Sequence, residues 1–150
     1  MSRYLMDTNI LLRYADTGAG QHSLIVQALE ILALRQNEVV MVPQTVYEFW
    51  SVATCPADKN GLGWTTTEVS NVIGKVIKRF LLLPDTPDIF ENWLELVTRF
   101  EVKGKQVHDA RIVAAMQTHN VATLLTLNIK DFARYAEIEA VHPEDISDEQ

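Results

Sequence analysis

The chain has 150 residues, 47% of them hydrophobic and 22% charged, and its formal net charge is −7. This length suits one domain with its own core, and the lone cysteine, Cys55, excludes an internal disulfide. No apolar run approaches the roughly 20 residues of a membrane span, and the first residues lack the basic and apolar segments of a signal peptide. We therefore expect a cytoplasmic protein without a membrane partner.

The sequence predicts strands that alternate with helices. In chain order we expect a strand over 3–6, a helix over 22–35, a strand over 39–42 and a helix over 43–54. These are followed by a helix over 66–80, a strand over 81–83, helices over 87–100 and 106–120, and strands over 122–127 and 137–141. Along the helix over 87–100 the expected buried stripe is Phe90, Trp93, Leu94, Val97 and Phe100.

The expected strands are mostly continuous apolar runs, as in strands that are buried on both faces. Such strands alternating with helices predict an α/β fold with a mainly parallel sheet covered on both faces. Ligands of these sheets bind outside the carboxyl ends of the strands. Asp7 and the segment Thr126–Asn128 lie at the carboxyl ends of two of the expected strands, so both should lie at that edge.

The negative charge is concentrated at the C-terminal end. Six acidic residues and no lysine or arginine lie from Glu137 onward, whereas the preceding part carries 14 acids and 13 bases. We therefore predict a folded domain over residues 1–142 and an acidic tail over 143–150. Because the charge of the remaining chain is nearly balanced, the whole-chain charge does not exclude nucleic acid as a partner.

Asp109 is the most informative acid of the sequence. Ile112, Val113 and Met116 lie three, four and seven residues after it, so its carboxylate is in line with the expected buried stripe. A favourable interaction with the helix dipole explains its place along the helix but not the side it faces. Glu48, in the first two turns of its helix, would in isolation fit a solvated surface residue.

Asp7, Glu48 and Asp109 each lie just after a strand or early in a helix, and these places converge at one edge of a parallel sheet. An aspartate that ends a strand is also common in turns, which is the alternative interpretation of Asp7. Clustered carboxylates repel one another unless a cation lies between them. Oxygen ligands favour a hard divalent ion, Mg²⁺ or Mn²⁺.

Four segments resemble the successive motifs of PIN-domain ribonucleases, in particular VapC-type toxins. They are LMDTNILL, VPQTVYEFWSVAT, GKQVHDARIVAAM and LLTLNIKDF, and they follow the motif order over nearly the whole chain. The resemblance implies a three-layer α/β/α fold with a mainly parallel five-stranded sheet. It also implies Mg²⁺- or Mn²⁺-dependent endonucleolytic cleavage of RNA, a homodimer, and inhibition by a cognate antitoxin.

The family's acidic triad matches Asp7, Glu48 and Asp109, which are the expected catalytic residues and metal ligands. Glu48 is expected either as the third ligand or as the group that orients the attacking water. Asn128 stands where many members carry a fourth acid. Asp131 is an alternative ligand, unless it caps a short helical turn, so the sequence leaves open whether one or two metal ions bind.

Other residues are expected to support this site. Polar groups near the acids are Thr8, Asn9 and Thr126. Candidate contacts to RNA phosphates, each of which also fits a solvated surface charge, are Lys103, Lys105, Arg111, Lys130 and Arg134. The helix over 22–35 is apolar around more than half its circumference, so we expect it to bind an antitoxin peptide or a second copy unless neighbouring helices cover it.

Two other functions fit parts of the pattern. A metal-dependent phosphatase of small phosphate esters would also use clustered carboxylates, but its haloacid-dehalogenase form requires an aspartate where this chain has Asn9. A catalytically silent module that binds RNA or protein would not require the acidic triad.

Overall fold

The computed structural model describes residues 2–146. Five strands form one sheet with the order β3-β2-β1-β4-β5, and each neighbouring pair is parallel. The strands are β1 (Arg3–Met6), β2 (Glu38–Met41), β3 (Leu81–Leu82), β4 (Thr123–Leu125) and β5 (Glu139–Val141). The α-helices are α1 (Thr8–Ala15), α2 (His22–Leu34), α3 (Pro43–Thr54), α4 (Thr66–Arg79), α5 (Pro87–Arg99) and α6 (Gln106–Thr118).

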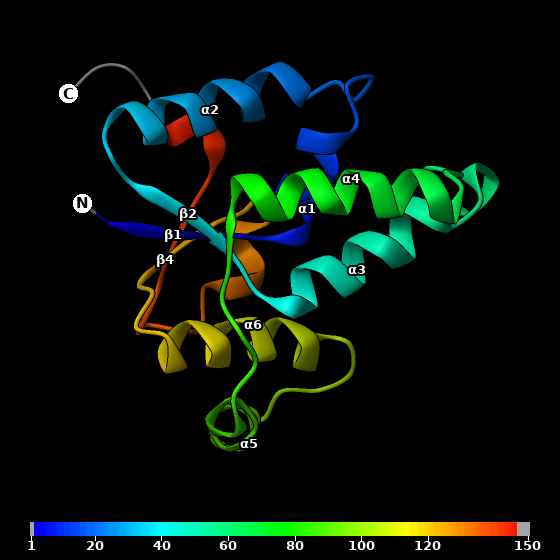
Figure 1. Cartoon of the computed structure of the whole chain (residues 1–150). Coiled ribbons are helices and arrows are strands. Elements are labelled where there is room, and N and C mark those ends of the chain that lie inside the picture. The colour runs from blue at the N-terminus through cyan, green and yellow to red at the C-terminus, as the bar shows by residue number, and fades with distance from the viewer. Residues whose placement is uncertain (1, 147–150) are drawn as a thin grey trace.

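Helices cover both faces of the sheet (Figure 1). Leu5 and Val40 belong to the core that the sheet shares with α5 and α6, whereas Met6 and Met41 belong to the core shared with α1 to α4. Successive strand residues point to opposite faces, which explains why both faces of the sheet are apolar. The predicted α/β fold, with a parallel five-stranded sheet between two helical layers, is confirmed.

The strand order reverses its direction at the central strand of the sheet. From the central strand β1 the chain continues to β2 and β3 on one side, and later returns to β4 and β5 on the other. This reversal between β1 and β4 is where open parallel sheets bind ligands. The backbone N–H of Asp7 donates to the carbonyl of Leu125 at 3.0 Å, so the two strand ends are joined there.

The helices differ from the sequence predictions in two places. No element was predicted for α1, whose eight residues follow β1 with only Asp7 between them. On α5, Trp93, Val97 and Phe100 of the predicted stripe pack against the core, but Phe90 and Leu94 are 63% and 49% exposed. Ile89 and Leu96 fill the core in their place, so the helix is rotated relative to the predicted stripe.

The expected acidic tail begins within the described part of the chain. Residues Pro143–Asp145 form a short 3₁₀ helix, η3, that lies against α2, and Ile146 packs on the core below it. Residues 147–150 of that tail lie outside the described residues. Between residues 2 and 146, no helix has both the length and the apolar content needed to cross a membrane.

Candidate active site at the carboxyl edge of the sheet

Asp7 follows β1 and is also the N-cap of α1. Its Oδ1 accepts the backbone N–H of Thr8 at 2.8 Å, and its Oδ2 accepts the hydroxyl of Thr126, at the end of β4, at 2.8 Å. Asp7 is only 9% exposed. It therefore caps a helix and also places a buried carboxylate where β1 and β4 end.

Asn9 ties the loop after β4 to the start of α1. Its amide N–H groups lie 3.4 Å from Asp7 Oδ2 and 3.3 Å from Thr126 Oγ1, and its Oδ1 accepts the N–H of Leu127 at 3.2 Å. The Thr126 hydroxyl also accepts the N–H of Asn128 at 3.0 Å. The structure thus brings the polar residues that were expected beside the acids into hydrogen bonds with Asp7 or with each other.

Glu48 lies on α3, which begins at Pro43 directly after β2. Its Oε1 accepts the hydroxyl of Thr8 at 2.7 Å, and its Oε2 accepts the side-chain amide of Gln44 at 3.1 Å. Thr8 therefore donates its N–H to one carboxylate and its hydroxyl to another. This single residue holds the Asp7 and Glu48 side chains near each other.

Asp109 approaches the same place from the first turn of α6. Burial raises the pKa of its carboxyl to about 6, and the negative charges of Asp7, Asp131 and Glu48 add to the rise. No hydrogen bond within residues 2–146 stabilises its charged form. Ile112, Val113 and Met116 are buried as predicted, and Asp109 itself is partly buried.

Burial also raises the pKa of Asp7, against the opposing effect of its hydrogen bonds from Thr126 and Thr8. Repulsion by Glu48 and Asp131 adds to the rise. Acids from α1, α3 and α6, and from the turn after β4, therefore influence one another electrostatically.

Asp131 and Asn128 differ in their relation to this cluster. Asp131 is the third residue of η2 (Ile129–Phe132), so the alternative interpretation that it caps this turn is wrong. Asn128 takes the cap position, makes no side-chain capping bond and is exposed. Of the two candidates for a fourth position, Asp131 is the one whose charge raises the pKa of both Asp7 and Asp109.

The candidate phosphate contacts fall into two groups. Lys103, Lys105 and Lys130 are exposed. Arg111 forms an ion pair with Asp85 at 3.3 Å, and Arg134 donates to Gln106 at 2.7 Å. Two of the five candidate cations are therefore held by other side chains of the protein.

The acids fit a hard cation in their chemistry, although their side chains do not form a complete cage. Over the described range, no three His, Cys, Asp or Glu side chains are placed to hold one ion. Mg²⁺, however, is usually bound by one or two carboxylates, with water and substrate phosphate as its other ligands. Asp7 and Asp109, whose charged forms are disfavoured by burial and by neighbouring acids, are the carboxylates that a cation would stabilise most.

Sequence reasoning missed two polar residues near the site, Gln44 and Asp85. Gln44 lies four residues before Glu48, which is the spacing of neighbours on one helix face and the only available indication of their contact. Asp85 carried no such indication, because its partner Arg111 belongs to a different element far along the chain.

Comparison with known proteins agrees with this fold. The model of the PIN domain matches residues 4–138. VapBC2 from Rickettsia felis, solved bound to a promoter DNA fragment, is similar with a TM-score of 0.72 and 19% identity over 93% of this chain and 98% of that one. A toxin–antitoxin complex from Klebsiella pneumoniae has a TM-score of 0.65 and 25% identity, with 93% and 97% covered.

VapC20 from Mycobacterium tuberculosis, a toxin that cleaves the sarcin–ricin loop, has a TM-score of 0.66 and 15% identity, with 92% of this chain and 99% of that chain covered. No curated protein matches in sequence. The family match covers nearly all of the described chain and includes each acid of the candidate site. The chain belongs to the PIN domain family.

Proposed function

We propose that the chain is a metal-dependent endoribonuclease that hydrolyses RNA phosphodiester bonds. PIN-domain proteins are nucleases, so the family assignment supports hydrolysis of nucleic acid. The observation that carries the proposal is the convergence of Asp7, Glu48 and Asp109 at the reversal point of the sheet, with Thr8 joining the first two. These three residues offer carboxylate oxygens, and oxygen ligands favour Mg²⁺ or Mn²⁺.

In the proposed reaction Asp7 and Asp109 hold the ion, and Glu48 is a third ligand or orients the attacking water. Asp131, rather than Asn128, is the proposed fourth acid. The bound ion would polarise the scissile phosphate and lower the pKa of a coordinated water. Thr8 fixes the direction of the two carboxylates that it contacts.

Residues around the acids would bind the RNA backbone. We propose the exposed Lys103, Lys105 and Lys130 as phosphate contacts, with Arg134 and Arg111 as further candidates. Such contacts supply affinity and position the substrate but carry no sequence information by themselves.

Chelation is expected to abolish cleavage of RNA, because the carboxylates alone cannot activate water or stabilise the charge that develops on the phosphate. Removal of metal with EDTA, followed by dialysis and addition of Mg²⁺ or Mn²⁺, should remove and then restore the cleavage of total cellular RNA. The same preparations should be assayed on a chromogenic phosphate monoester. Turnover of the monoester without cleavage of RNA would favour the phosphatase alternative, and cleavage of RNA after exhaustive chelation would contradict the proposal.

We further propose that the chain is the toxin of a toxin–antitoxin pair. Solved neighbours of this fold include toxin–antitoxin complexes. A cavity of about 530 Å³ lies between α1, α2 and α4, with apolar lining from Tyr14, Val26 and Val72 and basic groups from Lys75 and Arg79. An antitoxin segment with apolar and acidic side chains would fit this groove. Val26 belongs to the helix for which a partner was predicted unless neighbouring helices covered it. Most apolar residues of that helix are buried in the chain's own core, so only the part beside this groove is proposed for the partner.

A second copy of the chain would cover a different surface. Tyr47 on α3 is 66% exposed, and Phe90 and Leu94 lie one turn apart on the exposed side of α5. Hollows beside Tyr47 and beside Phe90 share His108 and Arg111 in their lining, so both aromatic rings border the same end of α6. Exposed apolar groups gathered in this way are typical of an interface.

The double substitution Phe90→Ser and Leu94→Ser is therefore expected to weaken a homodimer at least about tenfold, because each side chain loses apolar area buried on association. Sedimentation velocity over a range of concentrations measures this change. Leu34→Ser is the matched control, since Leu34 is an almost wholly exposed leucine on the opposite layer. A wild-type chain that is monomeric at every concentration would contradict the homodimer.

A further inference from the structure

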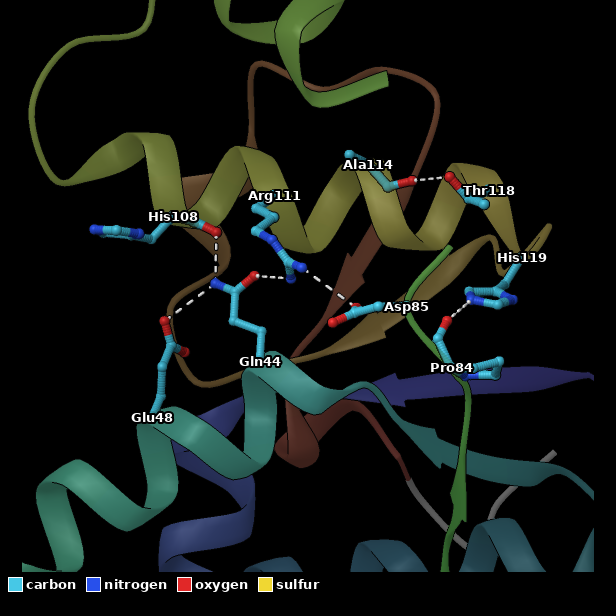
Figure 2. A network of polar contacts seen from close by, with 9 residues as sticks. All are labelled: Gln44, Glu48, Pro84, Asp85, His108, Arg111, Ala114, Thr118 and His119. Carbon is cyan, nitrogen blue, oxygen red and sulfur yellow. Dashed lines mark hydrogen bonds and ion pairs between the residues drawn. The ribbon is translucent and has the colours of Figure 1, made fainter. Parts of the chain in front are cut away.

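A line of polar contacts leads from the loop before α5 to the candidate active site (Figure 2). Asp85 pairs with Nη2 of Arg111 at 3.3 Å, and Nη1 of Arg111 donates to Oε1 of Gln44 at 3.1 Å. Nε2 of Gln44 donates to the carbonyl of His108 at 2.8 Å and to Oε2 of Glu48 at 3.1 Å. We propose that Gln44 is a positioning residue that fixes the direction of Glu48, and that Arg111 and Asp85 hold Gln44 in place.

The orientation of the Gln44 amide is determined by its partners on α6. A carbonyl oxygen such as that of His108 only accepts, and the guanidinium of Arg111 only donates. The amide must therefore present its NH₂ group to His108 and its oxygen to Arg111, since the flipped amide would lose both bonds. The second N–H of the NH₂ group is then directed at Glu48.

Burial makes this arrangement specific. Gln44 is 6% exposed, so water cannot easily replace a lost partner of its amide. Gln44 and Glu48 are one turn apart on α3, but a glutamine on an unpacked helix surface would sample several rotamers. The contacts with α6 select the one rotamer that reaches Glu48 (Figure 2).

Glu48 is consequently held from two sides. Thr8, at the start of α1, donates to Oε1, and Gln44 donates to Oε2. A carboxylate with a donor on each oxygen has a fixed plane, and both proposed roles of Glu48 need a fixed direction. Partners that orient a ligand side chain typically change activity or metal affinity 10- to 100-fold when they are removed.

The same contacts give Arg111 a role other than binding RNA. Its guanidinium contacts Gln44 and Asp85 at the same time, which needs the planar fork of arginine. Arg111→Lys keeps the positive charge, and lysine still binds phosphate as a point charge. If Arg111 positions Gln44, this substitution should lower kcat and leave KM for RNA unchanged. If Arg111 were mainly a phosphate contact, kcat should be maintained.

The inference rests on the proposed nuclease function, so its test needs one measurement that is independent of cleavage. The two side-chain N–H signals of Gln44 in ¹⁵N-labelled protein, assigned by their loss in Gln44→Leu, provide it. In EDTA they should be well separated and slow to exchange with solvent. One should shift in Glu48→Gln, which removes the charge of its acceptor, and both should exchange faster in Arg111→Lys, which removes the guanidinium that orients the amide.

The kinetic test compares Gln44→Leu with Thr118→Val. Thr118 is the matched control because its hydroxyl accepts the amide of Asn92 at 2.8 Å and so joins α6 to α5 without contact to the acids. Gln44→Leu should lower kcat about 10- to 100-fold with KM for RNA changed less than about twofold. Thr118→Val should leave both constants unchanged.

A double-substitution cycle tests whether Gln44 acts through Glu48. In a Glu48→Ala background, Gln44→Leu should cause no further loss of rate, because residues that act through one contact are not additive. Additive losses, or a Gln44→Leu protein that matches Thr118→Val, would overturn the inference while the nuclease function stands. If the wild type cuts no RNA in Mn²⁺, the proposed function is wrong. In that case the Gln44 signals alone test the inference, which is overturned if they exchange fast with solvent and do not shift in Glu48→Gln.

Discussion

The substitution Asp7→Asn is expected to lower RNA cleavage by more than about 100-fold, beyond what is lost when only an outer partner of a metal ligand is removed. Asparagine keeps the size of the side chain and one oxygen, and it is a good N-cap, so α1 should still begin at Thr8. The change removes a buried negative charge that the neighbouring acids disfavour. The protein should therefore remain folded while its proposed metal site loses a charged ligand.

Single-turnover cleavage of RNA in saturating Mn²⁺, together with thermal melts in EDTA, measures both parts of this prediction. Asp16→Asn is the matched control, because Asp16 is the C-cap residue of the same helix and lies at its other end. Its rate should equal that of the wild type. An Asp7→Asn protein that is folded and cleaves RNA within tenfold of the wild-type rate would contradict the catalytic assignment of Asp7.

The sheet could be predicted from sequence because burial on both faces leaves a direct pattern in the residues. The runs over 39–42 and 122–127 have no polar face, and this property distinguishes a covered parallel strand from an edge strand. Once the sheet was known to be parallel, Asp7 and Thr126 had to lie at its carboxyl edge. The structure joins them by a 2.8 Å hydrogen bond.

Features that depend on how two helices are packed could not be predicted in this way. On α5, a stripe through Phe90 and Leu94 and a stripe through Ile89 and Leu96 share Trp93, and periodicity alone cannot decide which faces the sheet. The contact between Gln44 and Arg111 likewise exists only because α3 and α6 meet at the end of the sheet. The two residues are far apart along the chain, so no local sequence pattern indicates that they touch.

Asp109 has two incompatible interpretations that stability measurements separate. An acid in the first turn of a helix is stabilised by the helix dipole, so its removal should cost roughly 0.3–1 kcal/mol. In this structure, however, burial and the charges of Asp7, Asp131 and Glu48 raise the pKa of Asp109 to about 6. The charged form is therefore destabilising in the absence of metal, and Asp109→Asn should leave the free energy of unfolding equal or higher in EDTA.

The pH dependence follows from the direction of that change. The carboxyl of Asp109 binds its proton more tightly in the folded chain, at a pKa of about 6, than in the unfolded chain, at about 3.9. Its stabilising contribution is then fully present below about pH 4 and is lost as the pH rises through 6. Asparagine does not titrate, so the Asp109→Asn variant does not lose stability in this pH range. At pH 7.5 the variant should be up to about 1 kcal/mol more stable than the wild type, after allowance for screening at a half-buried group, and near pH 4 the two should be equal.

Metal should reverse the order of stability. At an Mg²⁺ concentration of 100 times its dissociation constant, the wild type gains about 2.7 kcal/mol from binding, and the variant gains less because one charged ligand is missing. Thermal melts at pH 7.5 in EDTA and in Mg²⁺, with a parallel assay of RNA cleavage, measure this reversal.

Asp88→Asn is the control for the dipole effect, since Asp88 is an exposed acid in the first turn of α5. Asp88→Asn should lose a little stability in both conditions and no activity. If Asp109→Asn melts clearly lower than the wild type in EDTA and still cuts RNA, Asp109 is a structural residue of α6 and the proposed metal site has lost one of its acids.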